Sequence, residues 1–430
     1  MSVPAGRPPE PGDLLDLTVG EVVHGGWCIA RPAAADGRVI FVRHALPGER
    51  VRAVITQTTS KFARADAVAI LAAADGRVEP RCPHARPGGC GGCDWQHASL
   101  PAQRALKAAV IRQQLRRIAG IDREVTVEPL DGHEDGLGWR TRVRFAVRPD
   151  GVAGLRRHRS HQVVAVGACP IAHPLASWVT RSRWPGARSV EVAVAPGPDE
   201  RAVIISGGKS RYPSWPDRAA GSVLARAPGG GLTVLRGSGF LYQQAAGRSW
   251  RVSAGTFWQV HPAAASALAE AVLGALAPRP GEVALDLYCG AGLFAGVLAE
   301  AVGPDGAVVA IEQDTSAVRD ARHNLRRTPW ARVHKGDVTA LLGRHGVSGA
   351  SLAVLDPPRA GAARGVVELL AAAGADTALS RIAYVSCDPA TLARDLAIFG
   401  ENGWDLAALR AFDAFPMTHH VECLATLTRW

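Results

Sequence analysis

The carboxyl-terminal part of the chain alternates short apolar runs with amphipathic segments. The apolar runs EVALDLY, AVVAIE, SLAVLDPP and RIAYVSC begin at residues 282, 307, 351 and 381. The segments that follow have helical spacing, at 292–302, 314–327, 364–373 and 390–400. Buried strands that alternate with helices are typical of a doubly wound, mostly parallel sheet. The pattern therefore predicts an α/β, Rossmann-like domain over residues 256–430.

The first 255 residues instead show short strand-like runs broken by Gly, Pro and Asp. Residues 1–13 have the composition of a disordered leader, and residues 14–72 have the pattern of a small β-barrel. Residues 73–255 are predicted to form a mostly-β central domain that contains a Cys- and Gly-rich loop. The chain is thus expected to be a multi-domain protein.

One helix is predicted inside this central region, over residues 98–120. Its apolar face holds Ala108, Ile111, Leu115 and Ile118, and Gly120 is its stop signal. The apolar residues Leu106 and Val110 lie off that face, so the stripe is imperfect. This helix is a candidate to pack on the carboxyl-terminal domain.

Composition adds limits on the class of protein. Of the 430 residues, 47% are hydrophobic and 20% are charged. No run of about 18 uninterrupted apolar residues occurs, so no membrane span is expected. The amino terminus lacks the charged-then-apolar order of a signal peptide, and we therefore expect a cytoplasmic protein. No feature of the sequence indicates a protein partner.

The formal net charge of +10 is unevenly distributed. Residues 101–160 hold 13 basic and 7 acidic residues, which is more than half of the net charge. Arg140, Arg142 and Arg144 alternate in WRTRVRFAV, so on a strand they share one face. Such a row is either a solvated edge strand or a phosphate-binding surface. Because no acidic residue is interleaved, the row favours phosphate binding.

A glycine turn follows the first strand of the α/β domain, in LDLYCGAGLFA. Gly290, Gly292 and Ala295 match the G-x-G-x-x-G/A spacing that brings a nucleotide cofactor close to a helix amino terminus. Glu312 ends the next strand, where it could hold ribose hydroxyls. Asp337 follows the third strand, where it could recognise an adenine. By itself this pattern leaves a nicotinamide-dependent oxidoreductase open.

The fourth strand favours a different cofactor. In LDPPRAG, Asp356 ends the strand, and two prolines stiffen a turn at the edge of the sheet where ligands bind. An Asp-Pro-Pro turn at this place resembles the fourth motif of S-adenosylmethionine-dependent methyltransferases and is not expected in a nicotinamide site. S-adenosylmethionine is therefore the predicted cofactor.

The fifth strand ends at Cys387, in YVSCDPATL. Asp388 is a good N-cap and Pro389 a good first helical residue. A lone Cys is either a small buried residue or, at a ligand-binding edge, a nucleophile, and the position favours the nucleophile. The helix amino terminus favours the thiolate whereas Asp388 opposes it, so the sequence leaves the net thiol pKa open.

A thiol nucleophile at a methyl-donor site suggests pyrimidine chemistry. Carbon 5 of uracil is too weak a nucleophile to accept a methyl group until a thiolate adds to carbon 6. A base must afterwards remove the proton from carbon 5. Glu422, at the start of the terminal strand, is a candidate for that base, the alternative being an ordinary solvated Glu.

Four other cysteines have the pattern of a metal site. Cys82, Cys90 and Cys93 are clustered in RCPHARPGGCGGCDWQH, and Cys169 follows in VGACPIAHP. Three clustered thiols and a remote one suit an iron–sulfur cluster or zinc, whereas disulfides are not expected without a sign of export.

Taken together, these motifs resemble the bacterial RNA (uracil-5-)-methyltransferase family, in its iron–sulfur-containing branch that modifies 23S ribosomal RNA. The likeness covers nearly the whole chain. The amino-terminal β-domain resembles a TRAM domain, an OB-like RNA-binding barrel. The resemblance implies a [4Fe-4S] cluster on the four cysteines and a methyl donor held by Gln259 of GTFWQVHP together with Tyr288, Gly290, Gly292, Glu312, Asp337 and Asp356. It also implies Cys387 as the nucleophile and Glu422 as the base.

Three departures from the family pattern stand out. Seven residues separate Cys82 from Cys90, which is longer than usual. His261 stands where Asn is commoner, and Asp388 replaces the frequent Asn after the nucleophile. None of the three removes a residue that the mechanism requires.

The predicted function is methylation of uridine to 5-methyluridine, most consistent with 23S rRNA as the substrate. A tRNA uridine-54 methyltransferase, a cytosine-5 enzyme, a nicotinamide-dependent oxidoreductase and a non-catalytic RNA-binding protein stay as alternatives. The target base must leave its stack for the thiol to reach carbon 6. Binding of S-adenosylmethionine against NADH, and detection of 5-methyluridine, would distinguish the main alternatives.

Overall fold

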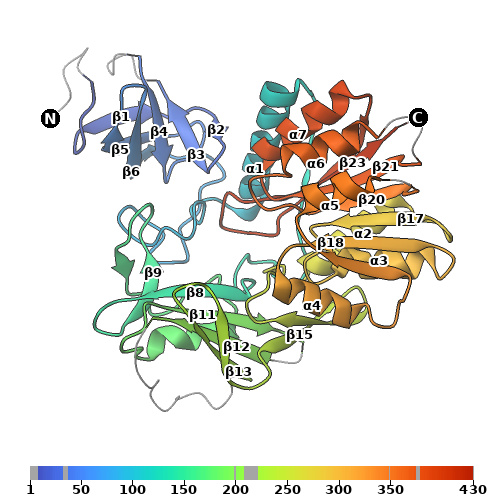
Figure 1. Ribbon diagram of the computed structural model, residues 1–430. Coiled ribbons are helices and arrows are strands. Elements are labelled where there is room, and N and C mark those ends of the chain that lie inside the picture. Colours follow the sequence, from blue (N-terminus) through green and yellow to red (C-terminus); the bar gives the residue numbers. More distant parts are fainter. Residues whose placement is uncertain are drawn as a thin grey trace.

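The computed structural model describes residues 8–31, 37–197, 200–207, 221–347, 349–373 and 378–429. These residues form an N-terminal β-sheet, a central β-sheet and a carboxyl-terminal α/β domain (Figure 1). Within the described residues, none of the helices is long and apolar enough to cross a membrane.

The N-terminal sheet has six strands in the order β1-β5-β6-β4-β3-β2. Its strands are β1 (Leu14–Thr18), β2 (Val22–Val23), β3 (Trp27–Ala30), β4 (Val39–Arg43), β5 (Arg50–Thr58) and β6 (Phe62–Ala72). The run from β1 to β2 pairs with β5 at its start and with β3 at its end, so the sheet curls back on itself. Alternate residues of β5 point into the core, as a half-buried strand requires.

Residues 9–13, which lie in the leader predicted to be disordered over 1–13, are hydrogen-bonded to β5. The Gly12 N–H donates to the Ile55 carbonyl at 2.8 Å, and the Ile55 N–H donates to the Asp13 carbonyl at 2.8 Å. The Thr58 hydroxyl donates to the Pro9 carbonyl at 2.6 Å. Residues 1–7 of that leader lie outside the described residues.

Helix α1 (Leu100–Gln114) lies between the N-terminal sheet and the carboxyl-terminal domain (Figure 1). Leu106 and Val110 pack in the core of the N-terminal sheet. Ala108 and Ile111 pack in the core of the carboxyl-terminal domain. The apolar stripe was imperfect in the sequence because the helix has two partners, one on each side. A π-helical turn, Leu115–Ala119, continues α1 and ends at Gly120.

The central sheet has seven strands in the order β10-β9-β8-β11-β12-β13-β14. They are β8 (Arg142–Val147), β9 (Ala153–Arg156), β10 (Val163–Val164), β11 (Ser189–Ala195), β12 (Glu200–Ser206), β13 (Ser222–Arg226) and β14 (Leu232–Arg236). A 3₁₀-helix, Pro174–Arg181, packs on it. The hairpin of β15 (Phe240–Ala245) and β16 (Arg248–Ser253) connects it to the carboxyl-terminal domain, because Trp250 of β16 is buried in the core of that domain.

The carboxyl-terminal sheet has eight strands in the order β19-β18-β17-β20-β21-β23-β22-β7. They are β7 (Val127–Glu128), β17 (Val283–Leu287), β18 (Ala307–Glu312), β19 (Ala331–Lys335), β20 (Leu352–Leu355), β21 (Arg381–Ser386), β22 (Asp405–Phe412) and β23 (Glu422–Thr428). The helices on its faces are α2 (Ala264–Leu276), α3 (Leu293–Val302), α4 (Thr315–Asn324), α5 (Val338–His345), α6 (Arg364–Ala371) and α7 (Pro389–Glu401). Strand β7 joins this sheet although it lies within the predicted central domain.

The order of the sheet defines where a ligand binds. Strands β17 to β21 are all parallel, and the order reverses between β17 and β20. In open α/β sheets ligands bind at the carboxyl ends of the strands that flank such a reversal. Tyr288 follows β17 and Asp356 follows β20, so both lie at this position. The antiparallel β23 begins at the same edge, because its first residues pair with the last residues of β21.

Candidate active site

Cys387 and Glu422 are brought together by strand pairing. Ser386, the last residue of β21, is opposite Cys423 in β23, so Cys387 emerges from the sheet where Glu422 enters it. Glu422 is buried, with 3% of its surface exposed, whereas Cys387 is partly exposed. A thiol that a ligand can reach is thus backed by a buried carboxyl group.

The surroundings of Cys387 hold its thiol in the protonated form. Burial raises the pKa of the Cys387 thiol to about 12, and the Glu422, Asp356 and Asp388 carboxylates contribute to the increase, while Arg359 opposes it. This result decides the balance that the sequence left open. Burial and nearby carboxylates hold the thiol pKa high although Cys387 stands at the amino terminus of α7, so thiolate formation requires additional positive charge or removal of negative charge.

Glu422 and Asp356 are neighbouring carboxyl groups, and the pKa of each is raised. Burial raises the pKa of Glu422 well above its usual range, and the Asp356 carboxylate adds to the effect. Burial also raises the pKa of Asp356 to about 7. Two neighbouring carboxyl groups in a poorly solvated site resist double ionisation. A carboxylate of this kind takes up a proton readily once it is ionised, which is what a general base must do.

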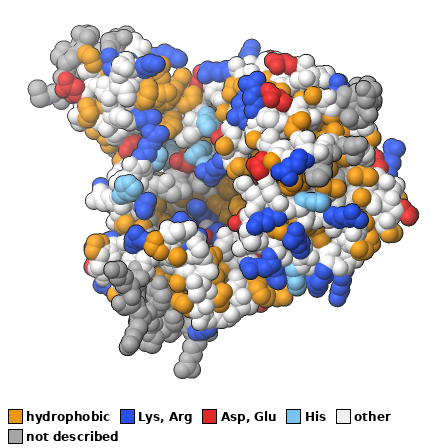
Figure 2. Space-filling view, in the orientation of Figure 1, with side chains coloured by type: hydrophobic (Ala, Val, Ile, Leu, Met, Phe, Trp, Pro, Cys, Tyr) orange, Lys and Arg blue, Asp and Glu red, His pale blue; other side chains and the backbone are white. Residues whose placement is uncertain are grey.

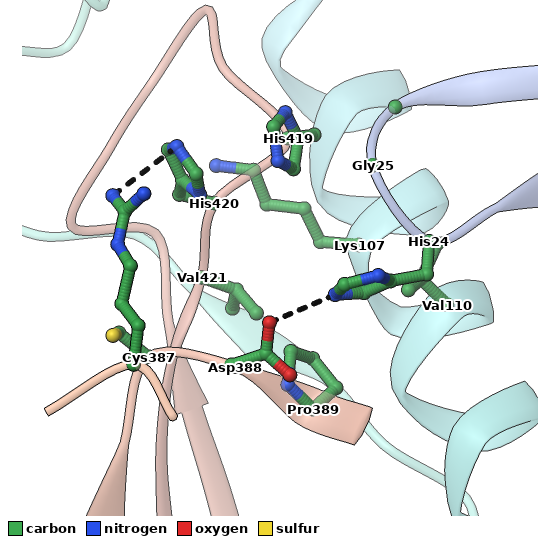
Figure 3. Close-up of a pocket in the computed structure, with 12 residues that line it drawn as sticks. His24, Gly25, Lys107, Val110, Cys387, Asp388, Pro389, His419, His420 and Val421 are labelled. Carbon is green, nitrogen blue, oxygen red and sulfur yellow. Dashed lines mark hydrogen bonds and ion pairs between the residues drawn. The ribbon is translucent and has the colours of Figure 1, made fainter. Parts of the chain in front are cut away.

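A pocket opens over Cys387 between three parts of the chain (Figure 3). It is lined by His24, Gly25 and Gly26 from the N-terminal sheet, Lys107 and Val110 from α1, Arg359 after β20, Cys387 to Pro389, and His419 to Val421. Figure 3 shows Asp388 facing His24, with 3.0 Å between the Asp388 Oδ2 and His24 Nε2 atoms. On the other side Arg359 Nη2 lies 3.3 Å from His420 Nε2. The pocket is rich in nitrogen donors.

The glycine turn after β17 is held in place by hydrogen bonds to Glu312. Its carboxylate accepts hydrogen bonds from the N–H groups of Gly290 at 3.0 Å, Gln313 at 2.7 Å and Asp314 at 2.8 Å. Gly290 has φ of 53°, and a Cβ there would meet no atom within 4 Å, so the turn faces open space. Gly292 has φ of 89° and forms the N-cap of α3. This is the geometry expected of a turn that approaches a ligand.

The other predicted cofactor residues occupy several positions. The Tyr288 hydroxyl accepts a hydrogen bond from the Ala363 N–H at 3.4 Å, and burial raises the pKa of this phenol. Asp337 is exposed and caps α5 by accepting from the Ala340 N–H at 2.9 Å. Gln259 is 7% exposed in the segment before α2. Four of the predicted residues therefore lie at the reversal of the sheet: Tyr288, Gly290, Glu312 and Asp356. Among the described residues, no hydrogen bond joins the Gln259 side chain to these four.

Two of the polar residues at this site were not selected from the sequence. Asp286 lies in β17 with no exposed surface, and its Oδ2 atom accepts from the Ala295 N–H at 2.7 Å. Burial raises the pKa of Asp286 to about 8. An acidic residue inside the apolar run EVALDLY was the available signal. His24 begins HGGWCIAR, a stretch that resembles the TRAM domain. The sequence did not place it at the methyl-transfer site, because it is distant in sequence from every motif of that site.

The four clustered cysteines converge on one cavity. Cys82, Cys90, Cys93 and Cys169 all line it, together with Gln96 and Arg140. The Gly92 N–H donates to Cys90 Sγ at 3.4 Å, and Gln96 Nε2 donates to Cys93 Sγ at 3.4 Å. Across the described residues, however, no group of three or more His, Cys, Asp or Glu side chains meets the geometry of a site for a metal ion. None of the eight cysteines, all of which lie among the described residues, forms a disulfide.

The predicted arginine row is partly engaged in internal contacts. Arg144 of β8 is opposite Glu191 of β11, and Arg142 and Arg144 both bind that carboxylate, at 2.8 and 2.6 Å. Arg142 also donates to the Ala254 and Thr256 carbonyls. The acidic partner was invisible in the sequence because it comes from a neighbouring strand. Arg142 therefore has a structural role in holding the central sheet together.

Arg140 and Arg144 nevertheless line a strongly basic cleft beside Cys90. Five further arginines line it with them: Arg156, Arg157, Arg159, Arg188 and Arg226. No Asp or Glu is among the described residues that line this cleft. Figure 2 shows Lys, Arg and His side chains around the hollow between the parts of the molecule. Such a cleft favours a polyanionic ligand.

Models of three known families match parts of the chain. A model of the TRAM domain matches residues 9–68, and a model described as tRNA (uracil-5-)-methyltransferase matches residues 349–430. Residues 258–350 match a protein-L-isoaspartate(D-aspartate) O-methyltransferase model.

Relatives match the chain over nearly its full length. An uncharacterized RNA methyltransferase of Streptomyces avermitilis is 49% identical over 97% of this chain and 98% of its own. A 23S rRNA (uracil(1939)-C(5))-methyltransferase of Alkalilimnicola ehrlichii is 32% identical over 97% of each chain. Among solved structures, the tRNA (uracil-54, C5)-methyltransferase of Pyrococcus abyssi, in complex with S-adenosyl-L-homocysteine, has a TM-score of 0.72. It is 22% identical and covers 96% of this chain and 100% of its own, and it shows the same fold.

Proposed function

The chain belongs to the RNA (uracil-5-)-methyltransferase family, and we propose that it methylates carbon 5 of a uridine in 23S ribosomal RNA. The observation that carries this proposal is the placement of Cys387 beside Glu422 at the ligand-binding edge of the sheet. The choice of ribosomal RNA is supported by full-length relatives that act on 23S rRNA, at 32 and 33% identity.

The two residues have complementary tasks. The Cys387 thiolate adds to carbon 6 of the uracil, which makes carbon 5 a nucleophile toward the donor methyl group. The Glu422 carboxylate then takes the proton from carbon 5, and the bond between carbon 6 and the Cys387 sulfur breaks to release the product. Arg359 lowers the pKa of Cys387, and it also stabilises the ionised form of Glu422.

The edge of the sheet suits S-adenosylmethionine, which supplies an electrophilic methyl group when bound. The Gly290 turn faces open space, and Glu312 stands at the end of β18, where a ribose can be held. Asp337 lies after β19, in the position for an adenine, and Tyr288 and Asp356 flank the reversal of the sheet. We assign Gln259 to the same site from the resemblance of GTFWQVHP to the family motif.

The RNA would be held by two surfaces. The N-terminal sheet matches the TRAM domain. Seven arginines line the cleft of the central sheet, and those other than Arg144 and Arg226, which bind Glu191, are available to phosphates. The pocket over Cys387 is concave and is enclosed by three parts of the chain, so the target base must leave its stack to enter.

We propose that Cys82, Cys90, Cys93 and Cys169 hold a [4Fe-4S] cluster rather than a single ion. One Zn²⁺ requires sulfurs within about 2.3 Å of a common point, and the described residues offer no such group. The four thiols instead surround a shared cavity, and two of their sulfurs accept N–H hydrogen bonds, as the sulfur ligands of clusters commonly do. The cluster would fix the loop, and we assign it no electron transfer.

The proposal is tested by nucleoside analysis of RNA after incubation with the enzyme and S-adenosylmethionine. We expect 5-methyluridine at one position of 23S rRNA, absent when the donor is omitted. Its formation in tRNA but not in rRNA would overturn the assignment of substrate. Formation of 5-methylcytidine, or of no methylated nucleoside in any RNA tested, would overturn the reaction.

A further inference from the structure

His24 lies far from every motif of the active site in sequence, yet it reaches the residue that follows the nucleophile. Its Nε2 atom is 3.0 Å from Asp388 Oδ2, across 364 residues of chain. Figure 3 shows the imidazole pointing along the pocket floor toward Asp388, with Cys387 on the far side of that carboxylate. The contact joins the N-terminal sheet to the methyl-transfer site.

The turn that carries His24 is held firmly in place. Its neighbour Gly26 has φ of 81°, and a Cβ on it would lie 2.9 Å from the Cβ of His419. The Gly26 carbonyl accepts a hydrogen bond from the Trp95 indole at 3.2 Å. Glu21, at the base of the turn, binds Gln113 and Arg117 at the end of α1 and in the π-helical turn that follows it. The position of His24 is therefore set by the fold, and no RNA is needed to create it.

Asp388 has two tasks that conflict at this site. Its Oδ1 atom accepts from the N–H groups of Ala390 and Thr391, both at 3.0 Å, and so caps α7. Its negative charge also lies next to Cys387, where it opposes ionisation of the thiol. A cation on the free Oδ2 atom resolves the conflict, and His24 occupies that place.

We propose that His24 is a positioning residue for Cys387. The imidazolium of His24 neutralises the charge of Asp388, so that this carboxylate caps α7 without opposing formation of the Cys387 thiolate. The electrostatic pattern agrees with the geometry. The hydrogen bond that His24 donates to Asp388 raises the pKa of His24. Contact with His24, together with the two capping hydrogen bonds, outweighs burial and lowers the pKa of Asp388 to about 2. The role in methyl transfer rests on the proposed function, whereas the effect on the thiol does not.

Other charged groups around the pocket set the background for this pair. Arg359, Asp356 and Glu422 act on Cys387 from the other side and are unchanged by substitution of His24. Lys107 is paired with Asp413 at 2.5 Å, and His419 with Asp94 at 2.6 Å. Burial lowers the pKa of His420 to about 3, so this residue is neutral. Of the pocket's histidines, His24 is the one in contact with Asp388.

The experiment measures alkylation of Cys387 by iodoacetamide in the free enzyme as a function of pH, followed on the Cys387 peptide by mass spectrometry. His24→Ala should slow alkylation at pH 7.5 by roughly 3- to 10-fold, the effect of one unpaired charge at a partly exposed site. His24→Gln, which keeps a hydrogen-bond donor but carries no charge, should be equally slow. In the double variant His24→Ala/Asp388→Asn the rate should return to at least that of the wild type.

The pH profile separates this role from simple docking of the N-terminal sheet. The wild-type rate of Cys387 alkylation divided by the His24→Ala rate should fall toward one as pH rises past the pKa of His24, because the wild-type imidazolium then loses its proton. With RNA and S-adenosylmethionine, kcat should fall while KM for RNA stays within about twofold. Arg52→Ala, which removes the Asp16–Arg52 ion pair of the same sheet outside the pocket, serves as the control and should alkylate like the wild type.

Parallel pH profiles for the wild type and His24→Ala, or a His24→Gln variant as fast as the wild type, would overturn the proposal. So would failure of Asp388→Asn to restore the rate in the double variant while circular dichroism shows an intact fold. These measurements need no RNA. A protein that shows the His24 effect but makes no 5-methyluridine would refute the proposed function and leave the inference about His24 standing.

Discussion

The Asp94 carboxylate Oδ2 lies 2.6 Å from the ring Nδ1 of His419, and the same oxygen accepts the His419 backbone N–H at 3.1 Å. Asp94 directly follows Cys93 of the cysteine loop, whereas His419 lines the pocket over Cys387. The N–H groups of Asp94 and Trp95 also donate to the Met417 carbonyl. The cysteine loop and the loop that leads to Glu422 are therefore one hydrogen-bonded unit.

This unit leads to a prediction for Cys82→Ser. The substitution should lower iron and sulfide content, reduce RNA affinity and destabilise the fold around the cysteine cavity. Binding of S-adenosylmethionine should stay within about threefold of the wild type, because Gly290 follows β17 and Glu312 ends β18, in a different part of the protein.

Metal and sulfide analysis measures the content of the cluster, a binding assay measures RNA affinity, and titration with S-adenosylmethionine measures donor binding. Cys28→Ala is a matched control, because Cys28 is buried in the N-terminal core and does not line the cysteine cavity. A selective loss of donor binding in Cys82→Ser would contradict the assignment.

Glu422→Gln should separate the two halves of the reaction. The thiol can still add to uracil and the methyl group can still be transferred, but the proton on carbon 5 has no base. Turnover should fall by roughly 10²- to 10⁴-fold, and a covalent enzyme–RNA adduct should accumulate on denaturing gels. Cys387→Ala is the control and should form neither the adduct nor the product. Rapid turnover by Glu422→Gln would remove Glu422 from the role of base.

Asp286 should give the protein a pH-dependent stability. Burial raises the pKa of Asp286 to about 8, above its value in an unfolded chain, so its contribution to stability is complete in acid and is lost as pH rises through about 8. Between pH 6 and pH 8 the wild type should lose about 2 kcal/mol of unfolding free energy from this group. Asp286→Asn should lack this loss.

Thermal unfolding of both proteins from pH 5.5 to 8.5 checks this expectation. Asp356 and Glu422 also have raised pKa values and are present in both proteins, so the difference between the proteins reports Asp286 together with its interaction with Asp356. A difference in midpoint that does not change with pH would show that Asp286 does not titrate in this range.

The arginine cleft should determine the salt dependence of RNA binding. Arg156 and Arg157 are exposed and line the cleft. Each change to Ala should weaken binding of different RNA sequences to a similar extent and reduce the slope of log affinity against log salt by about one. Arg364→Ala, which removes an exposed arginine of α6 that does not line the cleft, should leave the slope unchanged. Equal slopes for the three variants and the wild type would place the RNA elsewhere.

Local sequence features predicted much of the carboxyl-terminal domain. The apolar runs and the helical segments between them correspond to β17, β18, β20 and β21 and to α3, α4, α6 and α7 within a few residues. Some signals depend only on residues close by in sequence, and the sequence alone therefore predicts them. They include the turn glycines, the N-cap at Asp388 and the prolines after Asp356. Pairing between strands that are distant in sequence leaves no such trace. The pairing of β8 with β11 was therefore not predicted, and neither was Glu191 as the partner of Arg142 and Arg144.

The sequence by itself therefore determined the order of strands and helices, the glycine turn and a cysteine at the end of a strand, because each depends on neighbours along the chain. Tertiary structure decided which residues surround that cysteine, Cys387, and what pKa its thiol has. The antiparallel pairing of β21 with β23 places Glu422 beside Cys387, and folding of the N-terminal sheet against α1 brings His24 to Asp388. Burial then sets the thiol pKa, since the loss of water around a charge depends on every element that packs there.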